Sequence, residues 1–210
     1  MWLYLIIIFI PIIYFFTTIN KKTNTQVFLF RYIFSLSFFV GMSDMFGGYD
    51  RYIYGQIFDS IADITTINGD YIARGSFDFF AGEYGFTLLN IIISFITANR
   101  YIFILLITII IYWLLYLSLR KYTYNYPLAL ILFMGLWFYF TFTYLRQVLG
   151  ATIVWLSIDY IIKRDFKRFF IVWLVAYSMH NSAIIFFPFY FVAERKYKTS
   201  FIITIMALAL

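Results

Sequence analysis

The sequence contains no cysteine and very few charged residues. Without cysteine, disulfide bonds and thiol chemistry are excluded. Histidine occurs once, at His180, so there is no second histidine or cysteine to complete a metal site, and we expect neither a metal nor another cofactor. Only 12% of the 210 residues are charged, and the basic ones are dispersed, so we expect no nucleic-acid partner.

Apolar and aromatic residues are abundant instead, at 64% and 25% of the chain. A soluble domain of this length cannot bury so much apolar surface. The apolar runs are long and lack strict alternation, which favours helices over the strands of a barrel. The sequence therefore predicts an all-α, polytopic transmembrane helical bundle that forms a single membrane domain over residues 1–210.

Short polar breaks separate the apolar runs, which are Trp2–Ile19, Val27–Met42, Phe86–Thr97, Tyr101–Leu119, Tyr126–Phe142, Leu145–Ile162, Phe169–Val192 and Phe201–Leu210. The last run is too short to cross a bilayer. We therefore expect the chain to be cut at Leu210 and the natural protein to continue.

Residues 44–83 form the longest polar interruption and hold seven of the ten acidic residues: Asp44, Asp50, Asp59, Asp63, Asp70, Asp78 and Glu83. The positive-inside rule places Lys21 and Lys22 in the cytoplasm and this acidic, aromatic-rich loop outside. Within it, the spacing of apolar residues predicts an amphipathic helix over Tyr49–Ile64. That helix can form a wall that contacts sugars, or it can simply rest on the bilayer.

The shortest run, Phe86–Thr97, creates a conflict in topology. If it spans the membrane, the basic breaks at 120–121 and 163–168 both lie outside, against the positive-inside rule. If it does not, both lie inside. We therefore predict that Glu83–Ala98 is re-entrant or lies at the outer interface, and that the bundle contains broken helices.

Arg146 lies between two long apolar runs. An arginine at membrane depth costs about 2.5–3.5 kcal/mol on insertion scales, so it usually faces a partner, a cavity or a substrate. With the topology above, Arg146 lies near the outer face, where its guanidinium can bind phosphate. The alternative is an arginine that snorkels to the interface.

His180 lies in a polar cluster midway along the Phe169–Val192 run, and Pro188 is expected to kink or break that run. Histidine can act there as a base, an acid or a hydrogen-bond donor, or it can merely join packed helices. Asp50 and Glu83 adjoin glycines and aromatics at the ends of the acidic loop. Either can act as a base, although a solvated acidic loop explains most of the acids equally well.

Four motifs, in this order, resemble those of the EpsG family of polysaccharide-assembly membrane proteins. They are Gly48-Tyr49-Asp50 with Tyr54 and Phe58; Glu83-Tyr84-Gly85-Phe86; Arg146-Gln147-Val148-Leu149-Gly150; and His180-Asn181-Ser182-Ala183 with Pro188 and Tyr190. Tyr84 and Gly150 depart from the family pattern, which has proline and alanine there. The resemblance covers about residues 25–195.

The resemblance implies a multi-pass protein of the bacterial inner membrane that polymerises surface polysaccharide. Its substrates would be undecaprenyl-pyrophosphate-linked oligosaccharides at the outer leaflet, with membrane lipids and other polysaccharide-assembly proteins as partners. We expect Arg146, Gln147 and Arg51 to bind the lipid diphosphate. His180, Asp50 or Glu83 would be the catalytic base of this glycosyltransferase.

Two other functions stay open at this point. A transporter or flippase for lipid-linked oligosaccharides would use Arg146 to bind phosphate without chemistry. A membrane O-acyltransferase that acts on glycans also typically has a lone histidine at membrane depth, but the ordered motifs argue against it.

Overall fold

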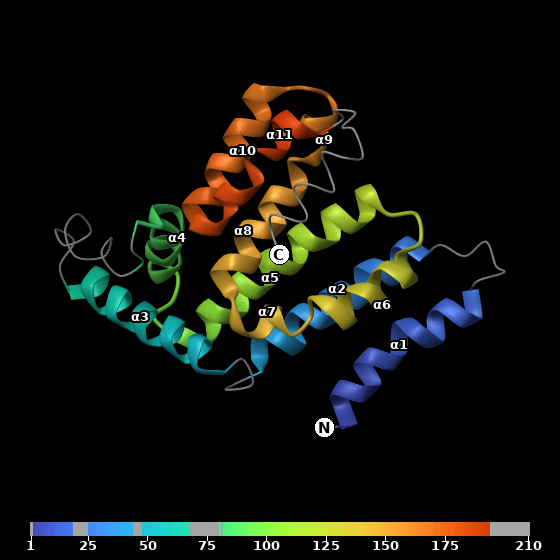
Figure 1. Cartoon of the computed structure of the whole chain (residues 1–210). Helices are drawn as coiled ribbons and strands as arrows, with labels where there is room; N and C mark the ends of the chain where they lie inside the picture. The colour runs from blue at the N-terminus through green and yellow to red at the C-terminus, as the bar shows by residue number, and fades with distance from the viewer. Residues whose placement is uncertain (1, 19–24, 44–47, 68–79, 81, 194–210) are drawn as a thin grey trace, which may run out of the picture.

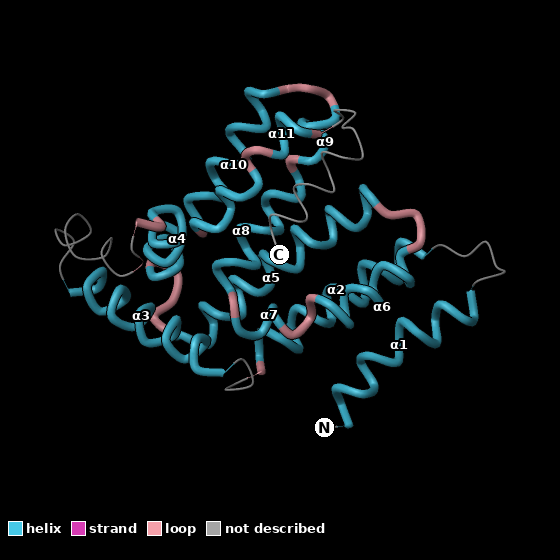
Figure 2. Tube along the Cα trace, in the orientation of Figure 1, coloured by secondary structure: helices cyan, strands magenta, loops and turns pink. Residues whose placement is uncertain are grey.

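The computed structural model describes residues 2–18, 25–43, 48–67, 80 and 82–193. Every regular element within these ranges is a helix, which confirms the predicted all-α class (Figures 1 and 2). Parts of the acidic loop (44–47, 68–79 and 81) and the predicted cut at Leu210 lie outside the described residues.

Eleven α-helices and one 3-10 helix are described: α1 (Trp2–Thr18), α2 (Thr25–Met42), α3 (Gly48–Ile67), α4 (Tyr84–Ser94), α5 (Arg100–Tyr122), α6 (Tyr126–Leu136), α7 (Phe140–Thr143), α8 (Leu145–Leu156), α9 (Ile158–Ile162), α10 (Phe166–Met179), η4 (Asn181–Phe186) and α11 (Phe189–Val192). The predicted amphipathic helix over Tyr49–Ile64 is confirmed as the middle of α3. Its apolar stripe, which includes Tyr54 and Phe58, is buried.

Helix α5 is central, with α2 packed along it and α8 against it, and α10 in turn packs on α8 (Figure 1). The core between these helices combines aliphatic and aromatic side chains. Phe58 of α3 stacks on Phe103 of α5 with ring centroids 4.2 Å apart. The hydroxyl of fully buried Tyr112 lies 2.9 Å from that of Thr141, so these two buried hydroxyls form a hydrogen bond with each other.

Side-chain caps fix where several helices begin. Asn99 accepts a hydrogen bond from the Tyr101 N–H at 2.8 Å and so begins α5. Asn125 caps α6 in the same way, and Asp165 caps α10. These caps satisfy backbone donors at helix starts and therefore hold the connecting turns in place.

Within the described ranges, two helical stretches are long and apolar enough to cross a membrane, Arg100–Tyr122 and Leu145–Ile162. Helix α4 has 11 residues and a length of about 16 Å, roughly half of a bilayer's hydrocarbon thickness. This length is compatible with the re-entrant or interfacial Glu83–Ala98. Its position relative to a bilayer stays a prediction.

The predicted broken helices are present. The Tyr126–Phe142 run is divided between α6 and α7, with the break at Trp137–Tyr139. In the Phe169–Val192 run the first break comes at His180, eight residues before the predicted one at Pro188. His180 is extended (φ −159°, ψ 130°), so α10 ends there and a 3-10 helix follows.

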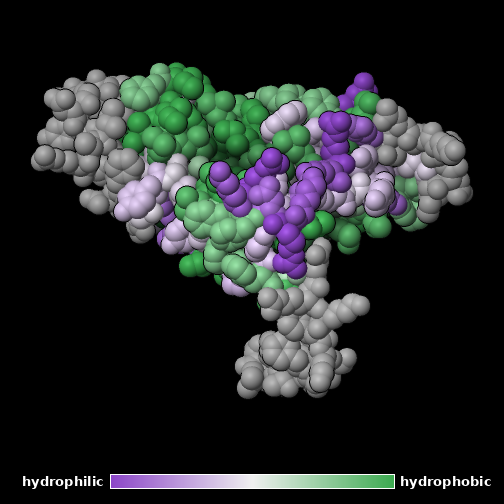
Figure 3. All heavy atoms as spheres, turned by 90° about the horizontal axis from the view of Figure 1, so that it is seen from above, coloured by the Kyte–Doolittle hydropathy of each residue, from purple (hydrophilic) through white to green (hydrophobic). Residues whose placement is uncertain are grey.

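Viewed from above, hydrophilic residues gather in a band flanked by hydrophobic surface (Figure 3). The turn between α9 and α10 lies at this end of the molecule (Figure 1), and the side chains of Lys163 in the turn and Arg168 in the first turn of α10 are each 70% exposed. Nearby, Lys121 at the end of α5 pairs with Asp159 of α9. These charged residues lie at the opposite end of α8 from Arg146.

Candidate functional site

Three helix ends meet around Glu83. Glu83 immediately precedes α4, Arg146 is the second residue of α8, and His180 immediately follows α10. In the sequence, Glu83 is separated by 63 residues from Arg146 and by 97 from His180. The fold therefore joins three motifs that are remote along the chain.

The Glu83 carboxylate is 3% exposed and both of its oxygens have partners. Oε2 accepts a hydrogen bond from Arg146 Nη1 at 2.5 Å. Oε1 lies 2.5 Å from His180 Nδ1 and also accepts from the Asn181 N–H at 3.2 Å. A buried carboxylate is tolerated because donors and a positive charge surround it.

The environment of Glu83 favours its ionised form. Burial alone would raise the pKa of this carboxyl, but the hydrogen bond with His180, the charge of Arg146 and the Asn181 N–H together outweigh burial and lower its pKa. Glu83 is therefore an anion at neutral pH. Because an ionised carboxylate only accepts, the proton between Glu83 and His180 is on Nδ1.

Arg146 is held on three sides. Its guanidinium carbon lies 5.3 Å from the Tyr54 ring centroid and 5.0 Å from that of Phe80, and Nε donates to the Tyr54 hydroxyl at 3.5 Å. Nη1 is used by Glu83, whereas Nη2 has no partner among the described residues. Since the side chain is 25% exposed, this group retains donors for an anionic ligand.

His180 has one ring nitrogen directed to Glu83 and a side chain that is 24% exposed. With the proton on Nδ1, Nε2 carries the lone pair that can accept a proton from a substrate. This is the arrangement in which a carboxylate orients a histidine base. The extended backbone at His180 places its ring at the end of α10.

Two glycines permit the close approach of these helix ends. A Cβ on Gly85 would lie 2.2 Å from Ser178 Oγ and 3.0 Å from the Ser178 carbonyl carbon. A Cβ on Gly150 would lie 3.3 Å from the Ala176 carbonyl oxygen and 3.5 Å from His180 Cβ. Glycine at position 85 thus lets α4 approach α10 and brings Glu83 within reach of His180.

The structure brings together three of the six predicted site residues, namely Glu83, Arg146 and His180. Gln147 is exposed beside Arg146. Asp50 lies in the first turn of α3, four residues and therefore one helical turn before Tyr54. These two residues border the site, and their predicted roles stay predictions.

Arg51 is placed differently from the other predicted diphosphate ligands. It is 4% exposed, and its Nη2 donates to the carbonyl oxygens of Val40 and Gly41 at 2.7 and 2.8 Å. These acceptors belong to the last turn of α2. The contacts join α3 to α2, and the structure does not bring Arg51 into the Glu83 cluster.

Sequence reasoning missed the aromatic contacts of Arg146. Tyr54 was predicted on the apolar face of an amphipathic helix, and its position in a family-like motif was the one signal that it belongs to the site. Phe80, three residues before Glu83, carried no such signal. Among the described residues no group of three or more His, Asp and Glu side chains is close enough to hold a metal ion.

The model of the EpsG family matches residues 28–210. The chain belongs to the EpsG family. No curated protein and no solved structure matches the chain. Together with the apolar helices, membership in the EpsG family indicates a membrane protein related to exopolysaccharide biosynthesis. The Glu83, Arg146 and His180 motifs all lie within the matched residues.

Proposed function

We propose that the protein polymerises a surface polysaccharide by glycosyl transfer between undecaprenyl-pyrophosphate-linked oligosaccharide units at the outer leaflet of the bacterial inner membrane. The observation that carries this proposal is the buried Glu83 carboxylate, which is bonded to a histidine on one side and an arginine on the other. A proton acceptor and an anion-binding group are thereby held at one place.

The transfer requires a base for the acceptor and stabilisation of the leaving group. The acceptor sugar hydroxyl gives its proton to His180 Nε2, and its oxygen forms a bond to the anomeric carbon of the donor. The bond from that carbon to the diphosphate oxygen breaks, and the lipid diphosphate leaves with the electron pair. The developing negative charge is stabilised by Arg146.

In this scheme Glu83 positions the other two residues and does not itself accept the proton. Its burial separates it from a bulky sugar, and both oxygens already accept hydrogen bonds. It holds Nδ1–H of His180 and stabilises the imidazolium that forms when Nε2 is protonated. It also fixes the orientation of the Arg146 guanidinium.

The carboxylate and histidine pair favours chemistry over transport. A flippase for the same lipids needs an anion-binding arginine, whereas an oriented base has no evident role in moving a lipid across the bilayer. An O-acyltransferase would also use the base on a glycan, but the ordered motifs argue against it.

The test compares glycans from a deletion strain complemented with the wild type, His180→Asn, Arg146→Lys or Arg168→Ala. The histidine and arginine variants are expected to lose the polymer ladder and accumulate single repeat units on the lipid carrier at the outer leaflet. Arg168→Ala, which removes an exposed arginine in the first turn of α10, is the control and retains the ladder. Accumulation of units at the inner leaflet would instead indicate a flippase, and loss of glycan acetylation an acyltransferase.

A further inference from the structure

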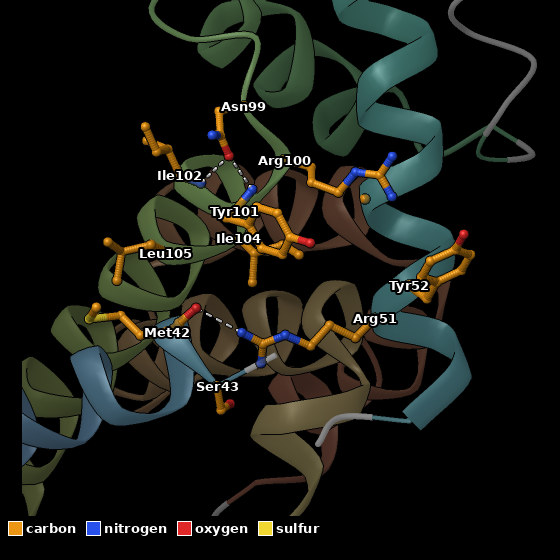
Figure 4. A pocket seen from close by; sticks show the side chains of 12 residues that line it. Met42, Ser43, Arg51, Tyr52, Asn99, Arg100, Tyr101, Ile102, Ile104 and Leu105 are labelled. Carbon is orange, nitrogen blue, oxygen red and sulfur yellow. Dashed lines mark hydrogen bonds between the residues drawn. The ribbon is translucent and has the colours of Figure 1, made fainter. Parts of the chain in front are cut away.

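A cavity of about 470 Å³ lies between the end of α2, the first half of α3 and the start of α5 (Figure 4). Its volume is within the range of small-molecule sites. The cavity is not part of the catalytic scheme above.

The polar wall of the cavity consists of planar groups with hydrogen-bonding edges. Arg51 and Tyr52 come from α3, and Arg100 and Tyr101 from the first turn of α5 (Figure 4). Arg100 pairs with Asp59, and its guanidinium carbon lies 5.9 Å from the Tyr52 ring centroid. These contacts fix the distance between α3 and α5 on the two sides of the cavity.

Gly55 sets the shape of this wall. A Cβ at position 55 would lie 3.1 Å from Arg100 Cδ and 3.6 Å from Arg100 Cβ. The glycine therefore lets the Arg100 stem lie directly on α3. The opposite wall is apolar and includes Met42, Ile104 and Leu105.

This combination fits a saccharide. A sugar ring has an apolar face that packs on aromatic rings and a rim of hydroxyls that bonds to planar donors such as guanidinium groups. Tyr52 and Tyr101 are 39% and 60% exposed, so their rings are available to a ligand. An inorganic anion would use hydrogen-bond donors but gain nothing from the faces of the two tyrosine rings.

The cavity and the Glu83 cluster both involve residues of α3. Gly55 lines the cavity, and the preceding residue, Tyr54, contacts Arg146. Helix α3 therefore contributes residues both to the cavity and to the contacts of Arg146.

We propose that this cavity binds the glycan part of a lipid-linked oligosaccharide and holds it while the next unit is added. The proposal rests on the proposed function for its biological role, but the binding itself can be measured separately. A glycan that stays bound is extended repeatedly, so the affinity of the cavity for the glycan sets the length of the polymer.

Two variants remove the proposed binding without touching the Glu83 cluster. Tyr52→Ala combined with Tyr101→Ala removes both exposed rings, and Ile102→Trp fills the cavity from a half-exposed position. Tyr49→Ala removes another exposed tyrosine of α3, and Leu128→Trp adds a tryptophan on α6. Neither position lines the cavity, so they are the matched controls.

In cells, both cavity variants are expected to make shorter polymer while still joining units, and both controls to make polymer of normal length. For the binding measurement, mild acid releases the repeat oligosaccharide from its lipid carrier. The free oligosaccharide is then titrated into the protein in nanodiscs, and its affinity is measured by calorimetry. The double tyrosine variant should bind it about tenfold more weakly than the wild type, and inorganic diphosphate should not compete.

Unchanged chain length and unchanged oligosaccharide binding in both cavity variants would overturn the proposal. So would inorganic diphosphate binding that depends on Tyr52 and Tyr101, because the cavity would then hold a headgroup. If His180→Asn still makes polymer while the cavity variants lose oligosaccharide binding, the catalytic proposal fails and the glycan site stands.

Discussion

Glu83→Gln isolates the role of the buried carboxylate with almost no change in side-chain size. Glutamine replaces one carboxylate oxygen by an NH₂ group, which is a hydrogen-bond donor. This donor would face another donor, either Arg146 Nη1 or the Nδ1–H of His180. It also removes the negative charge that fixes the His180 tautomer. Hydrogen bonds to charged groups contribute about 1.5–3 kcal/mol each, and the three bonds to the carboxylate, from Arg146, His180 and the Asn181 N–H, all lose its charge.

The catalytic loss has a cause of its own, which is separate from the effect of those bonds on folding. In acid–histidine pairs, replacing the carboxylate by an amide lowers turnover by up to about 10⁴-fold because the wrong tautomer is stabilised. For Glu83→Gln we expect at least about 10²-fold slower joining of lipid-linked repeat units. The assay is the initial rate of dimer formation by purified protein in nanodiscs.

A double-mutant cycle separates this effect from general damage. Glu83→Gln leaves the Arg146 charge without its buried partner, and Arg146→Gln leaves the Glu83 charge likewise, so each should lower the unfolding midpoint in detergent. Combining them removes both charges, and the double variant should be less destabilised than the sum of the two. A wild-type rate of dimer formation in folded Glu83→Gln would refute the reasoning.

Three further predictions concern the surroundings of this cluster. Tyr54→Phe keeps the ring under the guanidinium but removes the acceptor of Arg146 Nε, so the Michaelis constant for the lipid-linked unit should rise a few-fold with little loss of stability in a melt. Gly85→Ala should destabilise the protein by about 1–3 kcal/mol and slow glycosyl transfer, because the added Cβ would clash with Ser178. Adding Ser178→Gly should recover part of the stability and part of the rate, and a double variant without any recovery would contradict the clash. The pKa of Glu83 is lower in the folded protein than in the unfolded chain, so its contribution to stability is full above the ordinary glutamate pKa and is lost as the pH falls through the lowered value. The thermal unfolding midpoint should therefore fall in acid more for the wild type than for Glu83→Gln. Parallel pH curves for the two proteins would contradict this prediction.

Much of the helical architecture could be predicted because its signals are local. Apolar runs between polar breaks predict the helices. The helical spacing of apolar residues predicts α3, at Tyr54, Ile57, Phe58 and Ile61. The break at His180 was missed because apolar residues on both sides hid it. The weak helix formers His180, Asn181 and Ser182 are the local signal that marks it.

The three residues of the cluster were each predicted as candidates, but their contact was not. Arg146 and His180 stood out because polar groups in apolar surroundings are costly. Glu83 was one of seven acids in its loop, and nothing local showed that it would be buried. Arg51 shows the limit of such reasoning, since a cation beside a predicted site proved to bind backbone carbonyls of α2.

The central claim is that the Glu83, Arg146 and His180 cluster transfers a glycan. The most direct measurement is the product of one purified protein in liposomes that contain only the lipid-linked repeat unit. The account predicts a ladder of lipid-linked oligomers and released undecaprenyl pyrophosphate for the wild type, and neither product for His180→Asn. A folded His180→Asn protein that makes the same ladder, or a wild type that moves the lipid across the bilayer without joining units, would contradict it.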